Sequence, residues 1–150
     1  MARNRNRRKH PKRKIDPEPG KSPQIQSGIP ESFQGYKVRW SFSLLDMDGP
    51  FGWSRCSVSD LKKLKSRLSS FETMTWAEIE GDRHHSISIA DLSAQAKKRL
   101  DHEELNDVDE VFSLAIGGRE RVIGIRDRDV FKLLWWDPAH EVCPSKRPNT

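Results

Sequence analysis

Residues 111–144, VFSLAIGGRERVIGIRDRDVFKLLWWDPAHEVCP, predict three short β-strands joined by tight turns. We expect the strands at Val111–Ile116, Arg119–Arg126 and Val130–Trp136, and the turns at Gly117–Gly118 and Asp127–Asp129. The last strand is apolar on both faces apart from Lys132, which is typical of a covered, central strand. It ends at Asp137 because the following Pro138 cannot donate to a strand ladder. This stretch therefore predicts an antiparallel meander at the centre of the fold.

The chain before the meander begins with a further strand and a helix. Residues Tyr36–Asp46 alternate apolar and polar side chains, which is the pattern of a half-buried strand. Helical spacing of apolar residues follows at Leu61, Leu64, Leu68 and Phe71. Either Ser57 or Ser59 can cap the N-terminus of this helix.

Two more helices are expected before the meander. Thr75 and Glu78 form a capping box for a short helix that carries Trp76 and Ile79. A third helix has apolar positions at Ile89, Leu92, Ala96 and Leu100, and the acidic stretch after it predicts a loop. The predicted order is β-α-α-α-β-β-β, an α+β fold in which an antiparallel sheet carries its helices on one face.

A basic segment precedes this single domain, which we place at residues 36–144. Residues 1–21 hold nine Lys and Arg against two acids, a net charge of +7, while the rest of the chain holds 18 basic and 20 acidic residues. Residues 1–35 have few core-forming side chains and many Pro and Gly, so we expect a disordered tail, and a polar tail at 145–150. The basic tail either contacts nucleic acid or serves only to solubilise the chain. Its candidate RNA-binding residues are Arg3, Arg5, Arg7, Arg8, Lys9, Lys12, Arg13 and Lys14.

The chain shows no feature of a secreted or membrane protein. No apolar segment follows its charged start, and its longest apolar stretch, Val130–Trp136, is too short to span a bilayer. The two cysteines, Cys56 and Cys143, do not make a disulfide framework. We expect a cytoplasmic protein with no membrane partner.

The element order, the arginines on the late strands and the Trp-Asp-Pro-x-His end of the meander resemble the RelE/ParE-like toxin superfamily. The resemblance covers about Tyr36 to Pro144 and is one of topology and residue type. It implies a small bacterial toxin, often a ribosome-dependent mRNA endoribonuclease, that pairs with an antitoxin protein. RNA or the ribosome would then be its partners. The body is longer before the meander and less basic than such toxins usually are.

Several side chains near the meander could carry nuclease chemistry. An RNase without a metal needs a cation at the scissile phosphate together with a general base and a general acid. Arg119 or Arg121 could bind the phosphate, and His140, His85 or Asp137 could move protons or orient a histidine. Trp136 could stack on a base.

Each of these residues also has an ordinary structural interpretation. Hairpin arginines commonly pair with nearby acids, here Glu120, Asp127 and Asp129. Asp137 is a good turn former, and tryptophans on a central strand commonly belong to the core. On this view the meander is a docking surface of a non-catalytic module that binds protein or nucleic acid, or simply a folded core.

The sequence does not predict a cofactor or a metal site. His84, His85, His140, Cys143 and Cys56 invite a zinc hypothesis, but they lack the paired spacing of structural zinc ligands. The Gly117–Gly118 pair fits a hairpin turn rather than a nucleotide-binding loop.

Overall fold

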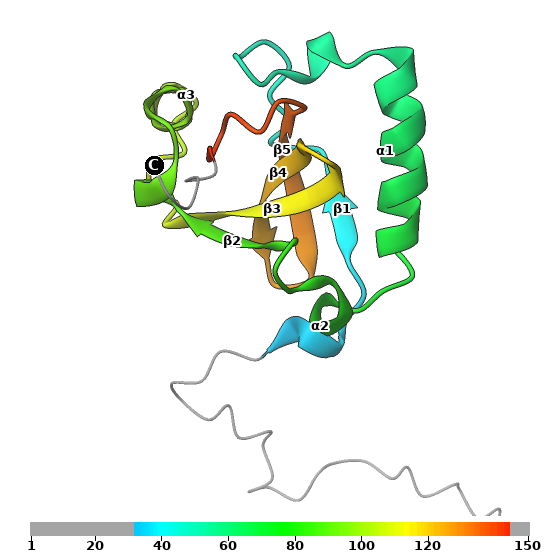
Figure 1. Cartoon of the computed structure of the whole chain (residues 1–150). Helices are drawn as coiled ribbons and strands as arrows, with labels where there is room; N and C mark the ends of the chain where they lie inside the picture. Colours follow the sequence, from blue (N-terminus) through cyan, green and yellow to red (C-terminus); the bar gives the residue numbers. More distant parts are fainter. Residues whose placement is uncertain (1–31, 145–150) are drawn as a thin grey trace, which may run out of the picture. The chain divides into compact units, whose positions relative to one another are not determined.

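The computed structural model describes residues 32–144, which form a mixed sheet with helices on both of its faces (Figure 1). The helices are α1 (Val58–Phe71), α2 (Trp76–Ile79) and α3 (Ala94–His102), with 3-10 turns η1 (Phe33–Gly35), η2 (Trp53–Arg55) and η3 (Ile89–Asp91). The strands are β1 (Arg39–Ser41), β2 (His85–Ser88), β3 (Glu110–Gly117), β4 (Glu120–Asp127) and β5 (Val130–Asp137). The predicted α+β class and C-terminal meander are confirmed.

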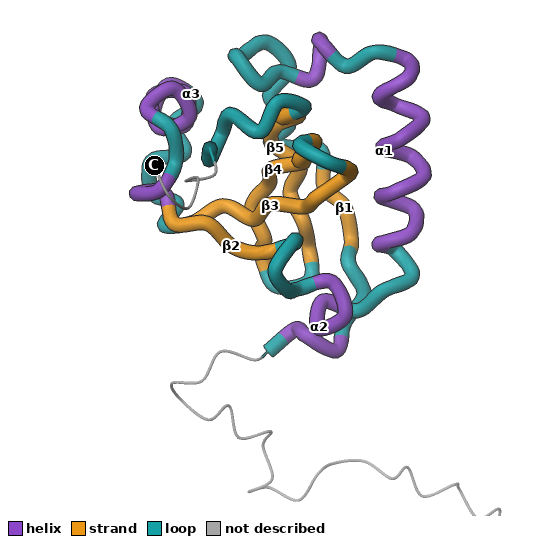
Figure 2. The backbone as a smooth tube through the Cα atoms, viewed as in Figure 1, coloured by secondary structure: helices purple, strands orange, loops and turns teal. Residues whose placement is uncertain are grey.

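The five strands lie in the order β1-β5-β4-β3-β2 (Figure 2). Three of the four pairings are antiparallel, and β1 runs parallel to β5. A bulge interrupts the β4–β5 ladder between Leu133 and Trp135. The Leu134 carbonyl at this bulge accepts hydrogen bonds from the Asp46 backbone N–H and the Trp53 indole, each at 3.0 Å. The bulge therefore ties the loop that follows β1 to the centre of the sheet.

Two apolar cores sandwich the sheet, so the prediction that the helices share one face is wrong. On one face, α1 and α2 bury Leu64, Phe71, Trp76 and Ile79 against the meander. On the other face, Leu92, Ala96 and Leu100 of the α3 region pack with Trp135 and Phe51. Figure 1 shows α1 and α3 on opposite sides of the strands. Strand β5, which is apolar on both faces apart from Lys132 and Asp137, required this arrangement, because a strand that is buried on both sides needs a covering layer on each.

Local capping signals explain where the helices begin. Ser57 and Asp60 form a reciprocal capping box at the start of α1, which decides between the two candidate caps. The predicted box of Thr75 and Glu78 at α2 is confirmed. The N-cap of α3 is Ser93, so this helix begins at Ala94 and not near Ile89, the first apolar position of the predicted third helix.

The extra strand β2 was not predicted, because the residues before the third helix, whose apolar positions begin at Ile89, were assigned to no element. The run Ser86-Ile87-Ser88 alternates with period two and pairs antiparallel with β3. Ser88 then caps the turn η3 by accepting a hydrogen bond from the Ala90 N–H. The regular part of β1 is also shorter than predicted, and Phe42 beyond its end is 67% exposed.

The ordered region begins before the predicted boundary at residue 36. Gln34 in η1 accepts a hydrogen bond at 3.1 Å from Arg126 and donates one to Glu80. Arg126 also pairs with Glu80 at 3.1 Å and lies over the Trp76 ring. These contacts hold η1, α2 and β4 together. The rest of the predicted tail, 1–31, and residues 145–150 lie outside the described residues.

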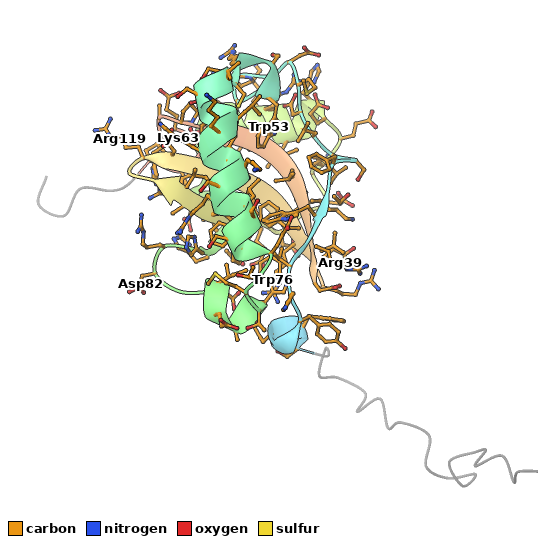
Figure 3. All side chains as sticks on the ribbon, turned by 90° about the vertical axis from the view of Figure 1, so that its right-hand side faces the viewer. Arg39, Trp53, Lys63, Trp76, Asp82 and Arg119 are labelled. Carbon is orange, nitrogen blue, oxygen red and sulfur yellow. The ribbon has the colours of Figure 1, made fainter. Side chains whose placement is uncertain are left out.

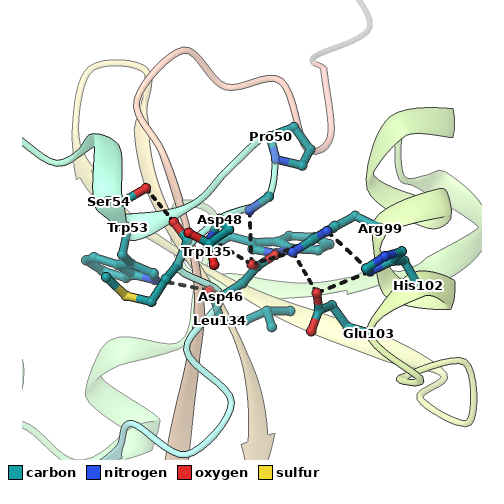
Figure 4. A network of polar contacts seen from close by, with 12 residues as sticks. Asp46, Asp48, Pro50, Trp53, Ser54, Arg99, His102, Glu103, Leu134 and Trp135 are labelled. Carbon is teal, nitrogen blue, oxygen red and sulfur yellow. Dashed lines mark hydrogen bonds and ion pairs between the residues drawn. The ribbon is translucent and has the colours of Figure 1, made fainter.

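A buried ion pair joins the loop after β1 to α3 (Figure 4). The Asp46 carboxylate, 3% exposed, accepts two hydrogen bonds from Arg99, at 2.8 and 2.9 Å, and one from the Trp135 indole at 3.0 Å. The backbone N–H of Gly49 donates to it as well. A Cβ at Gly49 would lie 2.4 Å from Arg99, so only glycine permits this close approach.

Within residues 32–144, no helix is both long enough and apolar enough to cross a membrane.

Candidate functional site

A groove of about 700 Å³ lies on the α3 side of the sheet, beside β2. It gathers titratable and polar side chains from separate parts of the chain, including Arg83, His85, Ser113, Arg121, His140 and Cys143. Three of the five predicted catalytic residues, His85, Arg121 and His140, therefore line one cavity. We call this cavity the β2 groove.

The pairing of residues across neighbouring strands shows which side chains form the floor of the β2 groove. His85 lies directly opposite Ser113, and Arg121 lies opposite both Ala115 and Asp137. Residues that face each other across adjacent strands project to the same side of a sheet. Ile123, two residues after Arg121, packs in the α3-side core, so this row of side chains also faces the α3 side.

Asp137 holds the turn that carries His140. Its carboxylate is buried and accepts hydrogen bonds from the backbone N–H groups of Glu141 and Val142, both at 2.9 Å. His140 itself has φ +60°, a left-handed conformation that such external bonds stabilise. The prediction that Asp137 orients a histidine is thus modified: Asp137 bonds the backbone and places His140 through the turn.

The C-terminal segment is anchored from the other side as well. The Ser93 N–H donates to the Val142 carbonyl at 2.8 Å, and the Cys143 thiol to the Asp91 carbonyl at 3.4 Å. Val142 is fully buried in the α3-side core. These contacts fix the wall of the β2 groove that contains His140.

Two arginines in the β2 groove, Arg83 and Arg121, make no ion pair with a carboxylate among residues 32–144, although Asp137 lies opposite Arg121 across the β4–β5 ladder. Arg121 donates only to the Gly118 and Glu120 carbonyls, and no ion pair joins Arg83 to any described residue. Burial is the main cause that lowers the pKa of Arg121, the nearby charge of Arg83 lowers it further, and the Asp137 carboxylate opposes the shift. By contrast, Arg39, Arg99, Arg126 and Arg128 all pair with acids. The interpretation that an arginine simply pairs with a nearby acid therefore holds for those four arginines but not for Arg121.

His84 is a structural neighbour of the groove rather than part of its lining. Its Nδ1 accepts a hydrogen bond at 3.0 Å from the Ala115 N–H, and its ring packs edge-on against Phe71. Burial is the main cause that lowers its pKa to about 4, and the positive charges of Arg67, Arg83, Arg121 and His85 lower it further. His84 is therefore neutral at pH 7, and it links the loop that carries Arg83 to β3.

We expect acid to destabilise the protein through His84. The unfolded histidine binds a proton near pH 6.5, whereas the folded one resists protonation down to about pH 4. Stability is therefore greatest above pH 6.5, and between about pH 7.5 and about pH 5 it should fall by about 1–2 kcal/mol. Urea unfolding at both pH values measures the loss. His84→Asn keeps an acceptor without the titration and should remove most of this fall; an equal fall in the variant would contradict the assignment.

Three predicted site residues of the described region do not line the β2 groove: Asp137, which supports the turn of His140, Arg119 and Trp136. Arg119 is exposed in the β3–β4 turn, one residue before β4 begins, and Figure 3 shows it at the hairpin tip, pointing away from the body. Trp136 is 2% exposed and packs with Trp53 in the core beside α1. This burial contradicts the prediction that Trp136 stacks on a base. The eight basic residues predicted to bind RNA, Arg3 to Lys14, lie outside the described residues.

Sequence reasoning missed Arg83, Ser113 and Cys143 as members of the groove. Arg83 precedes His84-His85, so recognition of β2 as a strand would have placed it at the same sheet edge as His85. Ser113 carried a signal of its own, because it is a polar residue in an otherwise apolar strand and is 4% exposed.

The chain matches no family model, no curated protein and no solved structure. The site must therefore be interpreted from its own geometry. Among residues 32–144, no three possible metal ligands lie close enough together to hold an ion. What the β2 groove offers is two histidines, two arginines, two aspartates, three serines and a cysteine.

Proposed function

We propose that this protein is a RelE-like, toxin-type endoribonuclease that cleaves mRNA in the cytoplasm. The observation that carries the proposal is the meeting of His85, His140, Arg83 and Arg121 in one groove. This set supplies an acid, a base and phosphate-binding cations, which are the groups that phosphodiester cleavage by side chains alone requires.

The proposed reaction is an internal transfer at phosphorus. One histidine accepts the proton of the ribose 2′-hydroxyl, whose oxygen then bonds to the adjacent phosphorus. The bond from phosphorus to the 5′ oxygen breaks, and the other histidine gives that oxygen a proton. The products are a 2′,3′-cyclic phosphate and a 5′-hydroxyl end. Arg121 and Arg83 would bind the non-bridging oxygens and stabilise the charge that builds up on them.

Charge around the groove supports the binding of an anion. The positive charges of Arg67, Arg83 and Arg121 all lower the pKa of His84, the residue next to His85. Asp82 and Asp91 also line the groove, so two carboxylates there oppose the charges of Arg83 and Arg121. The basic residues Arg3 to Lys14 would add non-specific affinity for RNA or the ribosome. A toxin of this kind would also need an antitoxin partner.

Cleavage of a defined RNA tests the proposal. We expect the purified protein to cut a single-stranded oligonucleotide or a ribosome-bound mRNA, and to leave cyclic phosphate ends in the presence of a metal chelator. Induced expression in a bacterial host should arrest growth with loss of intact mRNA. If RNA stays intact in all three settings, a binding module becomes the better interpretation.

A further inference from the structure

Ser113 is a polar residue on the floor of the β2 groove, in a strand that is otherwise apolar around it. It lies between Phe112 and Leu114, is 4% exposed and lines the groove. Its hydroxyl makes no hydrogen bond to any group within residues 32–144. Most buried polar side-chain atoms have a hydrogen-bond partner, so the partner of this hydroxyl is expected in whatever fills the groove.

His85 lies directly opposite Ser113 in the ladder between β2 and β3. Residues paired in this way have Cβ atoms about 4.5–5.5 Å apart and project to the same side of the sheet. Ile123, which faces Ser113 from β4, packs in the α3-side core, so Ser113 and His85 both face the α3 side. A single small group of a ligand can therefore contact both side chains.

The hydrogen bond of the His85 ring shows which of its nitrogens can accept a proton. Nδ1 lies 3.1 Å from the Ser86 carbonyl oxygen. A carbonyl oxygen can only accept, so Nδ1 carries the hydrogen, and in the neutral ring Nε2 has a free lone pair. His85 can therefore act as a base through Nε2, which leaves the role of acid to His140, the other histidine of the groove.

We propose that Ser113 and His85 together bind the ribose 2′-hydroxyl next to the scissile phosphate, and that Ser113 is a catalytic residue. The Ser113 hydroxyl donates a hydrogen bond to the 2′ oxygen, while His85 Nε2 accepts the proton that this oxygen loses. Ser113 keeps its own proton and stabilises the negative charge that the 2′ oxygen gains as it bonds to phosphorus. His140 gives a proton to the 5′ oxygen as its bond to phosphorus breaks. This assignment rests on the function proposed above.

Ser113→Ala tests the role of the hydroxyl. Single-turnover cleavage of an RNA oligonucleotide should slow by about 10–100-fold, because one donor to a partly charged oxygen is lost. Ser113→Thr keeps a hydroxyl and should recover much of the rate. Ser41→Ala is the control, because Ser41 lies in β1 outside the groove, and it should keep the wild-type rate.

Chemical denaturation separates this role from a structural one. The Ser113 hydroxyl has no partner in the described part of the chain, so Ser113→Ala should not lower the free energy of unfolding. A clear loss of stability would give the hydroxyl a structural role and overturn the proposal.

A competitor oligonucleotide with deoxyribose at the scissile position shows which atom Ser113 contacts. This competitor lacks the 2′ oxygen, so its inhibition constants for the wild type and for Ser113→Ala should agree within about twofold. Weaker inhibition of Ser113→Ala would place the hydroxyl at another part of the substrate and overturn the proposal.

A substrate with sulfur in place of the 5′ oxygen tests the roles of the two histidines, because a thiolate leaves without needing a proton. It should restore most of the rate to His140→Ala and none to His85→Ala, and the reverse pattern would overturn the assignment. If the wild type cleaves no RNA, the proposed function fails and this inference fails with it. If the wild type cleaves RNA and Ser113→Ala cleaves it equally fast, only this inference fails.

Discussion

Arg121→Ala should slow RNA cleavage by about 10²–10³-fold, because it removes a charged donor from the developing phosphorane. Arg121 suits this role because it lines the β2 groove and donates only to the Gly118 and Glu120 carbonyls, with no ion pair among the described residues. The loss should appear in kcat more than in KM, since the charge on phosphorus is largest in the transition state. Single-turnover cleavage of a labelled oligonucleotide measures it. Arg121→Lys keeps the charge without the planar fork and should recover part of the rate.

Arg119→Ala is the matched control, because Arg119 is two residues away but lies outside the groove. It should leave the rate nearly unchanged.

His140→Ala should lower the rate of RNA cleavage by about 10²–10⁴-fold if His140 transfers a proton. In a bacterial host, Arg121→Ala and His140→Ala should both relieve growth arrest. Full toxicity in both variants, with normal melting temperatures, would remove these residues from the mechanism.

Asp46→Asn should lower the free energy of unfolding by about 1–3 kcal/mol, because the buried bonds to the Asp46 carboxylate are lost while Arg99 keeps its ion pair with Glu103 at 2.6 Å. Arg99 would keep its positive charge, while the amide can neither balance that charge nor accept both guanidinium bonds. The indole of Trp135 would also lose a charged acceptor. Chemical denaturation at pH 7 measures the change. Asp48→Asn is the control, because Asp48 is exposed and should change stability by less than about 0.5 kcal/mol.

The pH dependence of this effect gives a second check. The Arg99 guanidinium is the main cause that holds the pKa of Asp46 at about 2, below its ordinary value of 3.8, and burial opposes the shift. The stability that the pair supplies is therefore fully present above pH 3.8 and is lost as the pH falls through about 2. The difference between wild type and Asp46→Asn should stay constant from neutral pH to about pH 4. A difference that vanishes by pH 5 would contradict the ion pair.

The sequence predicted those parts of the fold that rest on local signals. Alternation and turn residues located the meander to within a few residues, and the capping box of Thr75 and Glu78 located α2. Three of the predicted catalytic residues proved to line one cavity, because they stand at the ends of strands that pair with one another or lead into the same turn. In an antiparallel sheet whose strands are joined by short turns, the end of one strand lies beside the start of the next.

What the sequence could not predict depends on contacts between distant residues. Asp46 and Arg99 are 53 positions apart, and neither carries a local signal of its partner. Strand β2 has only four residues, and apolar residues at helical spacing follow it directly from Ile89 onward. Its alternation of polar and apolar side chains is therefore too short to indicate a strand. The placement of α3 on the opposite face follows from packing against Trp135 and Leu134, which the chain alone does not reveal.

The parallel pairing of β1 with β5 has a consequence for synthesis. Arg39–Ser41 must wait for Val130–Lys132 before it can join the sheet, and until then β1 has no neighbour. His140 and Cys143 follow β5, so the wall of the groove is the last part of the described region to leave the ribosome. Nascent chains that stop short of Val130 can have neither a closed sheet nor the groove. If the groove cuts mRNA, the protein is harmless to the ribosome that makes it until β5 has been made.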